Sequence, residues 1–281
     1  MKVLPFKIPK PENNALVVQE DRALMLYDKL HQHQEIQISL IKKGEGSFIV
    51  GDYVGEFGQG DMFVIGEHLP HVFHNDPDDA EVHMISLFFT KSSFGDHFFA
   101  LPEFTSLTPV FQAAAQGIQI QGPSFKLADL MERMPPKSQL NRFISFLEIL
   151  AVISTETLIP LSTLLHKKSY GEEEGKRMRD IFEFSLSNFD QNIGLSQVAG
   201  IANMTTNAFC RYFKQRTNKT YINFLLDIRI GHACKLLVKK TDLSIAEISY
   251  QSGFNNLTNF NRKFKAIKGI TPSEFRKKSF A

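Results

Sequence analysis

The chain has very few cysteines. Cys210 and Cys234 are the only two among 281 residues. Two thiols cannot build the disulfide framework of a small secreted domain, and there is no Cys-x-x-Cys pair to suggest a zinc site. We therefore expect both cysteines to be reduced thiols in the cytosol.

Long apolar runs are also lacking. The longest apolar stretches, such as residues 146–153, are interrupted by a charge, here Glu148, whereas a membrane-spanning helix needs about 20 predominantly apolar residues. The N-terminus, with prolines at positions 5, 9 and 11, has no continuous apolar segment like that of a signal peptide. These absences predict a soluble, cytoplasmic protein with no membrane partner.

The net charge is small, +2, but it is unevenly distributed. Residues 1–175 contain 14 Lys and Arg against 23 Asp and Glu, so 14 − 23 = −9. Residues 176–281 contain 18 and 7, so 18 − 7 = +11. This asymmetry predicts two domains, the basic one facing a polyanion such as nucleic acid. The glycine-flanked acidic run at 171–175 is the predicted linker.

The acidic half begins with a strand-like pattern. Short alternating or apolar segments are separated by glycine- and proline-containing turns every 8–12 residues, which favours a sandwich or small barrel. Strands are expected at 36–41, 47–50, 62–65, 72–73 and 82–89, and short helices at 94–100, 109–116 and 124–134. The fold class is therefore multidomain, with a sensing β-barrel and appended helices over residues 1–135, followed by a helical segment over residues 136–170.

The clearest long helix of the acidic half is predicted over residues 138–155. Its apolar residues recur at i, i+3, i+4 and i+7 around a wide face. A second copy of the chain could cover part of this face, which would make the protein a homodimer. An ordinary core-facing stripe explains the pattern equally well.

Five ionisable residues of the barrel are the candidate effector-binding residues. Three of them stand at i, i+2 and i+4 of one predicted strand, so their side chains share a face. Together with two histidines further along the chain they would form a polar site for a small molecule. The candidates are His31, His33, Glu35, His71 and His74.

A His-x-His strand followed by a segment containing Gly60, Pro70 and His71 resembles a cupin barrel. In metal-binding cupins the ligands are two His, a Glu and a later His. Here Gln37 occupies the position expected for the carboxylate, and an amide oxygen is a much poorer metal ligand. We therefore expect no metal and no cofactor. A metal site, or histidines that simply form hydrogen bonds at the barrel mouth, remain the alternatives.

The basic half contains an internal repeat. Residues 195–199 align with 245–249 at an offset of 50. Later positions align at an offset of 51: Phe209 with Phe260, Arg211 with Arg262, Phe213 with Phe264 and Lys214 with Lys265. Each copy, at about residues 193–217 and 243–268, predicts a helix, a tight turn and a second helix in an all-α double helix-turn-helix domain.

In the first copy, Ser196 is expected to cap a helix over 197–202, and Thr205 a second helix over 206–216. In the second copy, Ser244 caps a helix over 245–251, Gly253 supplies the turn, and Asn255 or Asn256 begins the next helix. Residues 221–239 predict a connecting helix, which would hold the two units at a fixed distance. Adjacent visits to the major groove lie about 34 Å apart on one face of B-DNA.

The predicted second helix of each copy carries polar and basic residues on its exposed face. Amide and hydroxyl groups near a helix N-terminus suit base edges, and Arg suits guanine or phosphate. Lysine at the far end suits phosphates. The candidate DNA-binding residues are Thr206, Asn207, Arg211 and Lys214 in the first unit, and Leu257, Thr258, Asn261, Arg262 and Lys265 in the second.

The second copy and its C-terminal extension resemble the signature of AraC-type (AraC/XylS) transcription regulators. The matching segments are Ala246-Glu247-Ile248, Gly253-Phe254, the run 260–265, Gly269 and the run 271–276. The resemblance covers about residues 176–278. It departs at Asn218, where the first copy usually has Gly, and at Leu257, an apolar residue on a recognition face that could touch a thymine methyl.

This resemblance implies a bacterial regulator that binds double-stranded DNA with both units, as a dimer held by its N-terminal domain. The effector would be a carbohydrate or related metabolite, and RNA polymerase is a further candidate partner. The resemblance also argues against an enzyme. Two other functions stay open: a cupin-type metal-dependent enzyme acting on a small acid or sugar, and a helical bundle that binds protein.

Overall fold

The computed structural model describes residues 15–24, 26, 29–75, 81–122, 124–163 and 172–279, and the structural statements below refer to these. The chain divides into two compact units, residues 1–175 and 176–281. Of the predicted linker, Gly171 lies outside the described residues, and residues 172–175 are helical, as the start of α4 (Glu172–Asn188). No helix among the described residues has the length and apolarity of a membrane span.

The first unit is built on two antiparallel sheets. The six-stranded sheet has the order β1 (Val17–Ala23), β7 (Val82–Phe89), β2 (Ile36–Lys43), β5 (Met62–Ile65), β8 (Ile118–Ile120) and β9 (Leu158–Pro160). The three-stranded sheet has the order β4 (Tyr53–Phe57), β3 (Gly46–Val50) and β6 (His71–His74). The five predicted strands are present, and β1, β4, β8 and β9 are additional. The unit is sheet-rich, as the predicted cupin-like domain requires.

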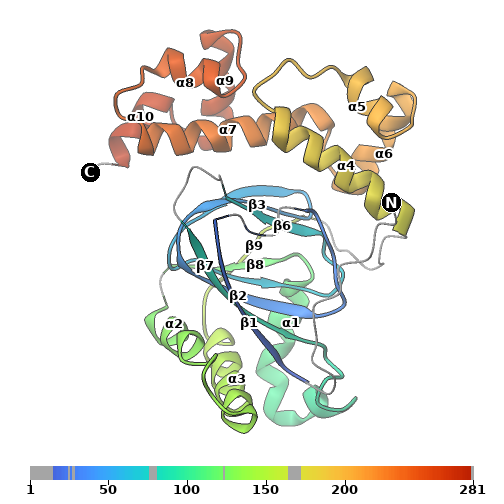
Figure 1. Ribbon diagram of the computed structural model, residues 1–281, viewed down its shortest axis with the longest axis vertical. Helices are drawn as coiled ribbons and strands as arrows, with labels where there is room; N and C mark the ends of the chain where they lie inside the picture. The colour runs from blue at the N-terminus through green and yellow to red at the C-terminus, as the bar shows by residue number, and fades with distance from the viewer. Residues whose placement is uncertain are drawn as a thin grey trace. The chain divides into compact units, whose positions relative to one another are not determined.

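Helices cover the outer face of the six-stranded sheet (Figure 1). They are the 3-10 helices η1 (Phe98–Ala100) and η2 (Pro102–Leu107), and the α-helices α1 (Thr108–Ala114), α2 (Phe125–Glu132) and α3 (Gln139–Ile153). The helix predicted at 94–100 is shorter, because residues 91–97 form turns before η1 begins. The predicted helix at 138–155 is confirmed as α3, which Ser138 caps.

Strand β2 shows how one sequence serves both faces of its sheet. Ile36, Ile38 and Leu40 belong to the core beneath the helices. The next residue, Ile41, belongs to a second core, lined by residues of both sheets. Because strand side chains alternate between faces, Gln37 and Ser39 share the inner face with Ile41. Polar residues are therefore buried between the two sheets.

The second unit is entirely helical among its described residues. After α4 come α5 (Leu195–Ile201), α6 (Thr206–Thr217), α7 (Tyr221–Lys239), α8 (Ile245–Gln251), α9 (Leu257–Lys268) and α10 (Pro272–Lys278). Helix α7 matches the predicted connecting helix and runs between the pair α5–α6 and the pair α8–α9 (Figure 1). The two pairs have equal helix lengths, 7 and 12 residues in each.

Most predicted helix caps are confirmed. Thr205, Ser244 and Asn256 each accept a hydrogen bond from the main-chain N–H three residues later. The prediction for Ser196 is wrong, because α5 begins at Leu195 with Gly194 as its N-cap. Ile193 and Val198 on either side are both buried, at the positions of a hydrophobic staple, and this packing starts the helix early.

The two helix-turn-helix copies use left-handed residues at matching places. Asn203 (φ 54°) and Gly253 (φ 79°) follow the first helix of each pair, and Asn218 (φ 56°) and Gly269 (φ 76°) end the second. Asn adopts this conformation more readily than other non-glycine residues. The departure from glycine at Asn218 therefore leaves the helix end intact. At Gly253 a side chain would also lie 2.6 Å from the carbonyl oxygen of Phe189.

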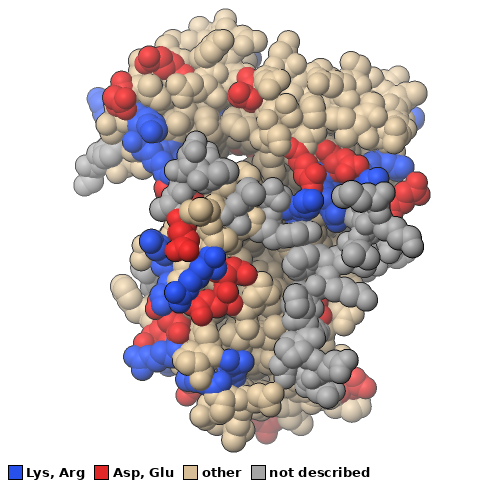
Figure 2. Space-filling view, viewed as in Figure 1, with Lys and Arg blue, Asp and Glu red and all other residues tan. Residues whose placement is uncertain are grey.

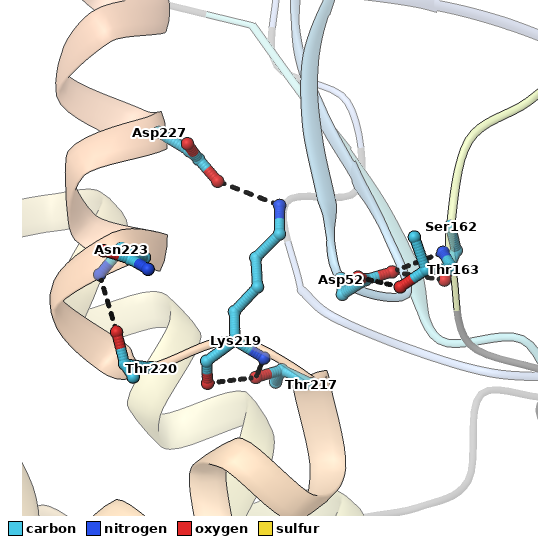
Figure 3. Close-up of polar contacts among 8 residues, drawn as sticks. All are labelled: Asp52, Ser162, Thr163, Thr217, Lys219, Thr220, Asn223 and Asp227. Atoms are coloured by element: carbon cyan, nitrogen blue, oxygen red, sulfur yellow. Dashed lines mark hydrogen bonds and ion pairs between the residues drawn. The ribbon is translucent and has the colours of Figure 1, made fainter. Parts of the chain in front are cut away.

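A buried carboxylate fastens the last described residues of the first unit (Figure 3). Asp52, in the turn between β3 and β4, is 3% exposed. Its Oδ1 accepts hydrogen bonds from Ser162 Oγ at 2.5 Å and from the Thr163 N–H at 2.9 Å. Its Oδ2 accepts one from Thr163 Oγ1 at 2.7 Å. These bonds hold the chain that leaves β9 against the three-stranded sheet.

Candidate nucleic-acid interface and buried histidine cluster

Helices α6 and α9, here called the recognition helices, each have one buried aromatic side. Phe209 and Phe213 of α6 are fully buried, as are Phe260 and Phe264 of α9. Residues four apart lie on one face of a helix. These pairs therefore anchor each recognition helix to its unit and turn the remaining faces toward solvent.

The structure places all nine candidate DNA-binding residues at the surface of α6 and α9. Thr206 and Leu257, the first residues of the two helices, stand three residues before Phe209 and Phe260 and therefore lie on the phenylalanine side. Thr206 and Asn261 are half-buried. The other seven are exposed: Asn207, Arg211, Lys214, Leu257, Thr258, Arg262 and Lys265. Each helix thus presents an arginine near its centre and a lysine in its last turn, whereas the first turn is polar in α6 and begins with an apolar residue, Leu257, in α9.

Arg262 is held by a neighbour on its own helix. Its Nη2 donates a hydrogen bond to Asn259 Oδ1 at 3.1 Å. In the first copy the residue equivalent to Asn259 is Ala208, whose side chain has no acceptor. The guanidinium of Arg262 therefore has a support that Arg211 does not receive from the equivalent position.

Other basic residues of the second unit have structural roles. Arg229 of α7 donates from Nε to the carbonyl of Phe189 and from Nη2 to that of Gln191, both at 2.7 Å. Burial lowers the pKa of this guanidinium from its usual value. Lys219 pairs with Asp227 at 2.9 Å (Figure 3). These side chains brace α7, so the positive charge available to a polyanion comes from other residues.

Surface charge is distributed differently on the two units. Over the sheet unit, Figure 2 shows Lys and Arg next to Asp and Glu. The ion pairs of this unit include Lys42–Glu132 (2.9 Å) and Arg133–Asp129 (2.6 Å). Most of the surface that this view shows over α5–α10 is uncharged. Since residues 176–281 carry a net charge of +11, their basic residues are not spread evenly over that unit.

Three of the predicted effector residues meet between the two sheets. His31 and His71 exchange main-chain hydrogen bonds of 3.0 and 2.9 Å, which sets their rings 4.3 Å apart. The ring of His33 lies 5.0 Å from that of His71. One nitrogen from each ring falls within 4.8 Å of the other two. His33 and His71 are buried and His31 is half-buried.

All three rings use Nδ1 in the same way. Nδ1 of His31 lies 2.8 Å from the carbonyl oxygen of Lys29, that of His33 lies 2.9 Å from Glu35 O, and that of His71 lies 2.8 Å from Leu69 O. A carbonyl only accepts, so in a neutral ring the proton is assigned to Nδ1 and the lone pair to Nε2. Burial favours this neutral form, because it lowers the pKa of His33 and takes that of His71 well below its usual value.

Gln37 completes the cluster. Its side-chain amide lies 3.2 Å from Nε2 of His33 and 3.1 Å from Nε2 of His71. The other end of the amide contacts Ser39 Oγ at 2.7 Å, and Ser39 in turn contacts Ser86 Oγ at 2.8 Å. This chain of buried polar groups crosses β2 to β7.

The two remaining predicted residues do not join the point where the rings meet. Glu35 is buried, but its carboxylate lies 3.7 Å from Nδ1 of His33, on the side facing the main chain. His74 stands three residues after His71 on β6, so strand alternation directs it to the opposite face. Gln37, Ser39 and Ser86 belong to the cluster although they are not among the site residues predicted from the sequence. Alternation along β2 signals the first two, whereas Ser86 depends on the pairing of β2 with β7.

Two family models match the chain. A helix-turn-helix domain covers residues 198–278, and a cupin domain covers residues 27–88. They fall on the recognition helices and on the histidine cluster respectively. The chain therefore contains a cupin domain and a helix-turn-helix domain, as the sequence predicted.

Several proteins with similar sequences are described as regulators of transcription or of an operon. An uncharacterized HTH-type transcriptional regulator of Bacillus subtilis, YdeC, is 25% identical over 259 residues, which cover 89% of this chain and 87% of that protein. The melibiose operon regulatory protein of Escherichia coli is 25% identical over 122 residues, covering 43% and 40%. Among solved structures, the DNA-binding domain of AdpA in complex with a target DNA is 23% identical, with a TM-score of 0.33, and covers 34% of this chain and 86% of that chain.

Proposed function

We propose that this chain, whose homologues are AraC/XylS-type transcription regulators containing a cupin domain and a helix-turn-helix domain, controls transcription by binding double-stranded DNA. The observation that carries the proposal is the pair of recognition helices, equal in length and each exposing amide or hydroxyl groups, an arginine and a lysine. Helix α7 has 19 residues. At 1.5 Å per residue it is about 28 Å long, close to the spacing of adjacent major-groove visits.

Salt dependence of DNA binding tests this proposal. DNA enriched by the full chain from a random pool should bind with an affinity that falls steeply with salt, because each phosphate contact releases counterions. Combined replacement of Lys214 and Lys265 by Ala should flatten this dependence. Replacement of Lys126, an exposed lysine of α2, by Ala is the matched control. Salt-independent binding without sequence enrichment would contradict the proposal.

The histidine cluster supports a small polar effector. His31, His33, Gln37 and His71 offer donors and acceptors whose directions are fixed by main-chain contacts. Hydroxyl groups of a carbohydrate match such groups, and one relative is named for a melibiose operon. Carbohydrates are therefore the class to test first. Melibiose, galactose and glucuronic acid are suitable probes. Binding can be detected as a higher melting temperature, because a ligand that binds only the folded state stabilises it.

A thermal-shift titration of the full chain measures this effect. A ligand that raises the melting temperature of the wild type should have less effect on His71→Asn and should act normally on His97→Gln, an exposed histidine outside the cluster. An equal shift in all three proteins would place the ligand elsewhere.

A second copy of the chain is the proposed partner of α3. Leu140 and Ile144 of this helix are 68% and 48% exposed, and they lie one turn apart on one face. Sedimentation of the full chain should report a dimer, and replacing both residues by Ser should lower its association constant. Replacing Gln112, an exposed residue of α1, by Ser is the control. A wild-type monomer at micromolar concentration would contradict this part of the proposal.

A metal-dependent activity is the second candidate function, and the shared use of Nδ1 favours it. Metal-binding histidines usually donate their other ring N–H to a carbonyl or carboxylate, which is the arrangement of His31, His33 and His71. Three imidazoles suit a divalent transition metal, and Gln37 suits it less well than a carboxylate would. A bound metal would act as a Lewis acid. Elemental analysis of the purified chain, with an assay for turnover of small acids and sugars, separates this candidate from a regulator.

A further inference from the structure

Two of the candidate DNA-binding residues are identical in the two recognition helices, and the residues of the first turns differ. At an offset of 51, Arg211 matches Arg262 and Lys214 matches Lys265. Both helices have 12 residues and an N-cap just before the first of them, so these side chains leave their helices at equivalent positions. The first turns differ, with Thr206-Asn207 in one and Leu257-Thr258 in the other.

Leu257 is more exposed than a leucine that only packs into a hydrophobic core. It is the first residue of α9, it is 42% exposed, and it adjoins the exposed residues Asn256 and Thr258. The buried cluster of this helix-turn-helix pair contains Phe254, Phe260 and Phe264, and Leu257 lies outside it. In the major groove the C5-methyl group of thymine is the apolar group that a base presents. An exposed leucine at the start of a recognition helix therefore has one complementary base.

Asn207 offers a different match. It lies at the second position of α6, is exposed, and carries an amide that can bond to both N6 and N7 of adenine. The equivalent position in α9 is Thr258, whose hydroxyl discriminates less between bases. The shared arginines suit guanine in both places. The two helices thus share an arginine and a lysine, and they differ in the first-turn residues that would distinguish between bases.

We propose that α6 and α9 recognise two unlike subsites, each containing a guanine contacted by Arg211 or Arg262. In the α6 subsite Asn207 selects adenine, and in the α9 subsite Leu257 selects thymine through its methyl group. This inference rests on the proposed function and adds the base preference of each helix. The subsites lie about one helical turn apart, roughly 10 base pairs. Because they differ, one chain binds its site in one direction only.

A uracil scan tests thymine recognition without altering the protein. DNA enriched from a random pool by the full chain is resynthesised with each thymine replaced in turn by uracil, which removes only the methyl group. The wild type should lose affinity about fourfold at one or two positions, as expected for one lost apolar carbon. Leu257→Ala should bind the unmodified site more weakly and show no further loss with uracil at those positions.

Ile267→Ala is the matched control, because Ile267 is also exposed (40%) but lies in the last turn of α9. It should keep the full sensitivity to uracil. Circular dichroism checks that each variant retains its helices, and the wild-type scan does not depend on either variant.

The outcomes separate this inference from the proposed function. Salt-dependent, sequence-specific binding by a wild type that tolerates every uracil would overturn thymine recognition and leave the regulator intact. Equal uracil sensitivity in wild type and Leu257→Ala would also overturn it, since another residue would then contact the methyl group. The absence of enriched sequences, together with salt-independent binding, would overturn the proposed function as well.

Discussion

The carboxylate of Asp52 accepts a hydrogen bond of 2.5 Å from Ser162, a residue 110 positions further along the chain. The neighbouring Gly51, with φ of 58°, donates its N–H to the carbonyl of Pro70 at 2.8 Å. Pro70 immediately precedes His71 of the histidine cluster. One turn therefore connects the segment that leads toward the second unit with a strand that carries the cluster.

Replacement of Asp52 by Ala should destabilise the first unit by about 2–4 kcal/mol. The change removes the acceptor of three hydrogen bonds and leaves the donor of Ser162 without it in a buried setting. Urea unfolding of the full chain, followed by circular dichroism, measures the loss. Asp96→Ala, at an exposed position, should change stability by less than about 0.5 kcal/mol. Equal effects of the two substitutions would contradict a structural role for the Asp52 contacts.

Stability should fall as the pH is lowered below about 6.5. The fold depresses the pKa values of His33 and His71, mainly through burial, so the unfolded chain binds more protons than the folded chain in this range. Unfolding is then favoured by up to about 1.4 kcal/mol per pH unit for each such histidine, until the pH passes its folded pKa. Melting temperatures between pH 8 and pH 5 measure this slope. His71→Asn should reduce it, and His97→Gln should not.

Arginine and lysine on the same recognition helix should have different effects on DNA binding. Arg262→Ala should cost about 1–3 kcal/mol and relax preference at one base pair. Lys265→Ala should weaken binding to all sequences alike and reduce the slope of log affinity against log salt by about 0.9. Competition binding with single-base variants of the enriched site separates the two. Identical sequence profiles for wild type and Arg262→Ala would exclude base recognition by this arginine.

Substitution of Gln37 by Glu should increase affinity for Mn²⁺. The amide of Gln37 lies 3.2 and 3.1 Å from two imidazole nitrogens, and a carboxylate at that position would add both charge and a hard oxygen ligand. Calorimetric titration of the full chain with MnCl₂ measures the change, which we expect to be at least about tenfold. Gln19→Glu, on β1, is the control for added charge. A weaker or unchanged affinity of Gln37→Glu would show that the cluster is not arranged for a metal.

The helical unit was largely predictable from sequence because its signals are local. Thr205, Ser244 and Asn256 cap their helices through bonds that span three residues, and the span of α7 follows from apolar spacing alone. The one wrong cap, Ser196, shows the limit of this approach. Burial of Ile193 moved the start of α5 to Leu195, and burial depends on the folded core rather than on neighbouring residues.

The histidine cluster was only partly predictable because it is assembled across strands. The strands β8 and β9 of the same unit could not be predicted either, because three residues are too few to show an alternating pattern. Ser39 faces Ser86 only because β2 pairs with β7 in one register. The spacing of His31 and His33 predicted that their rings lie near each other, but it did not predict that Gln37 contacts both His33 and His71.

The matched lengths of α6 and α9 make their first turns exchangeable. In each helix the capping residue, Thr205 or Asn256, and the buried phenylalanines lie outside the first two residues, which differ between the helices. Placing Leu-Thr at positions 206–207 would leave the cap and the aromatic anchor of α6 unchanged. In such a chimera both helices would prefer the same base sequence, so the DNA specificity of the domain could be changed by substituting two residues in one helix.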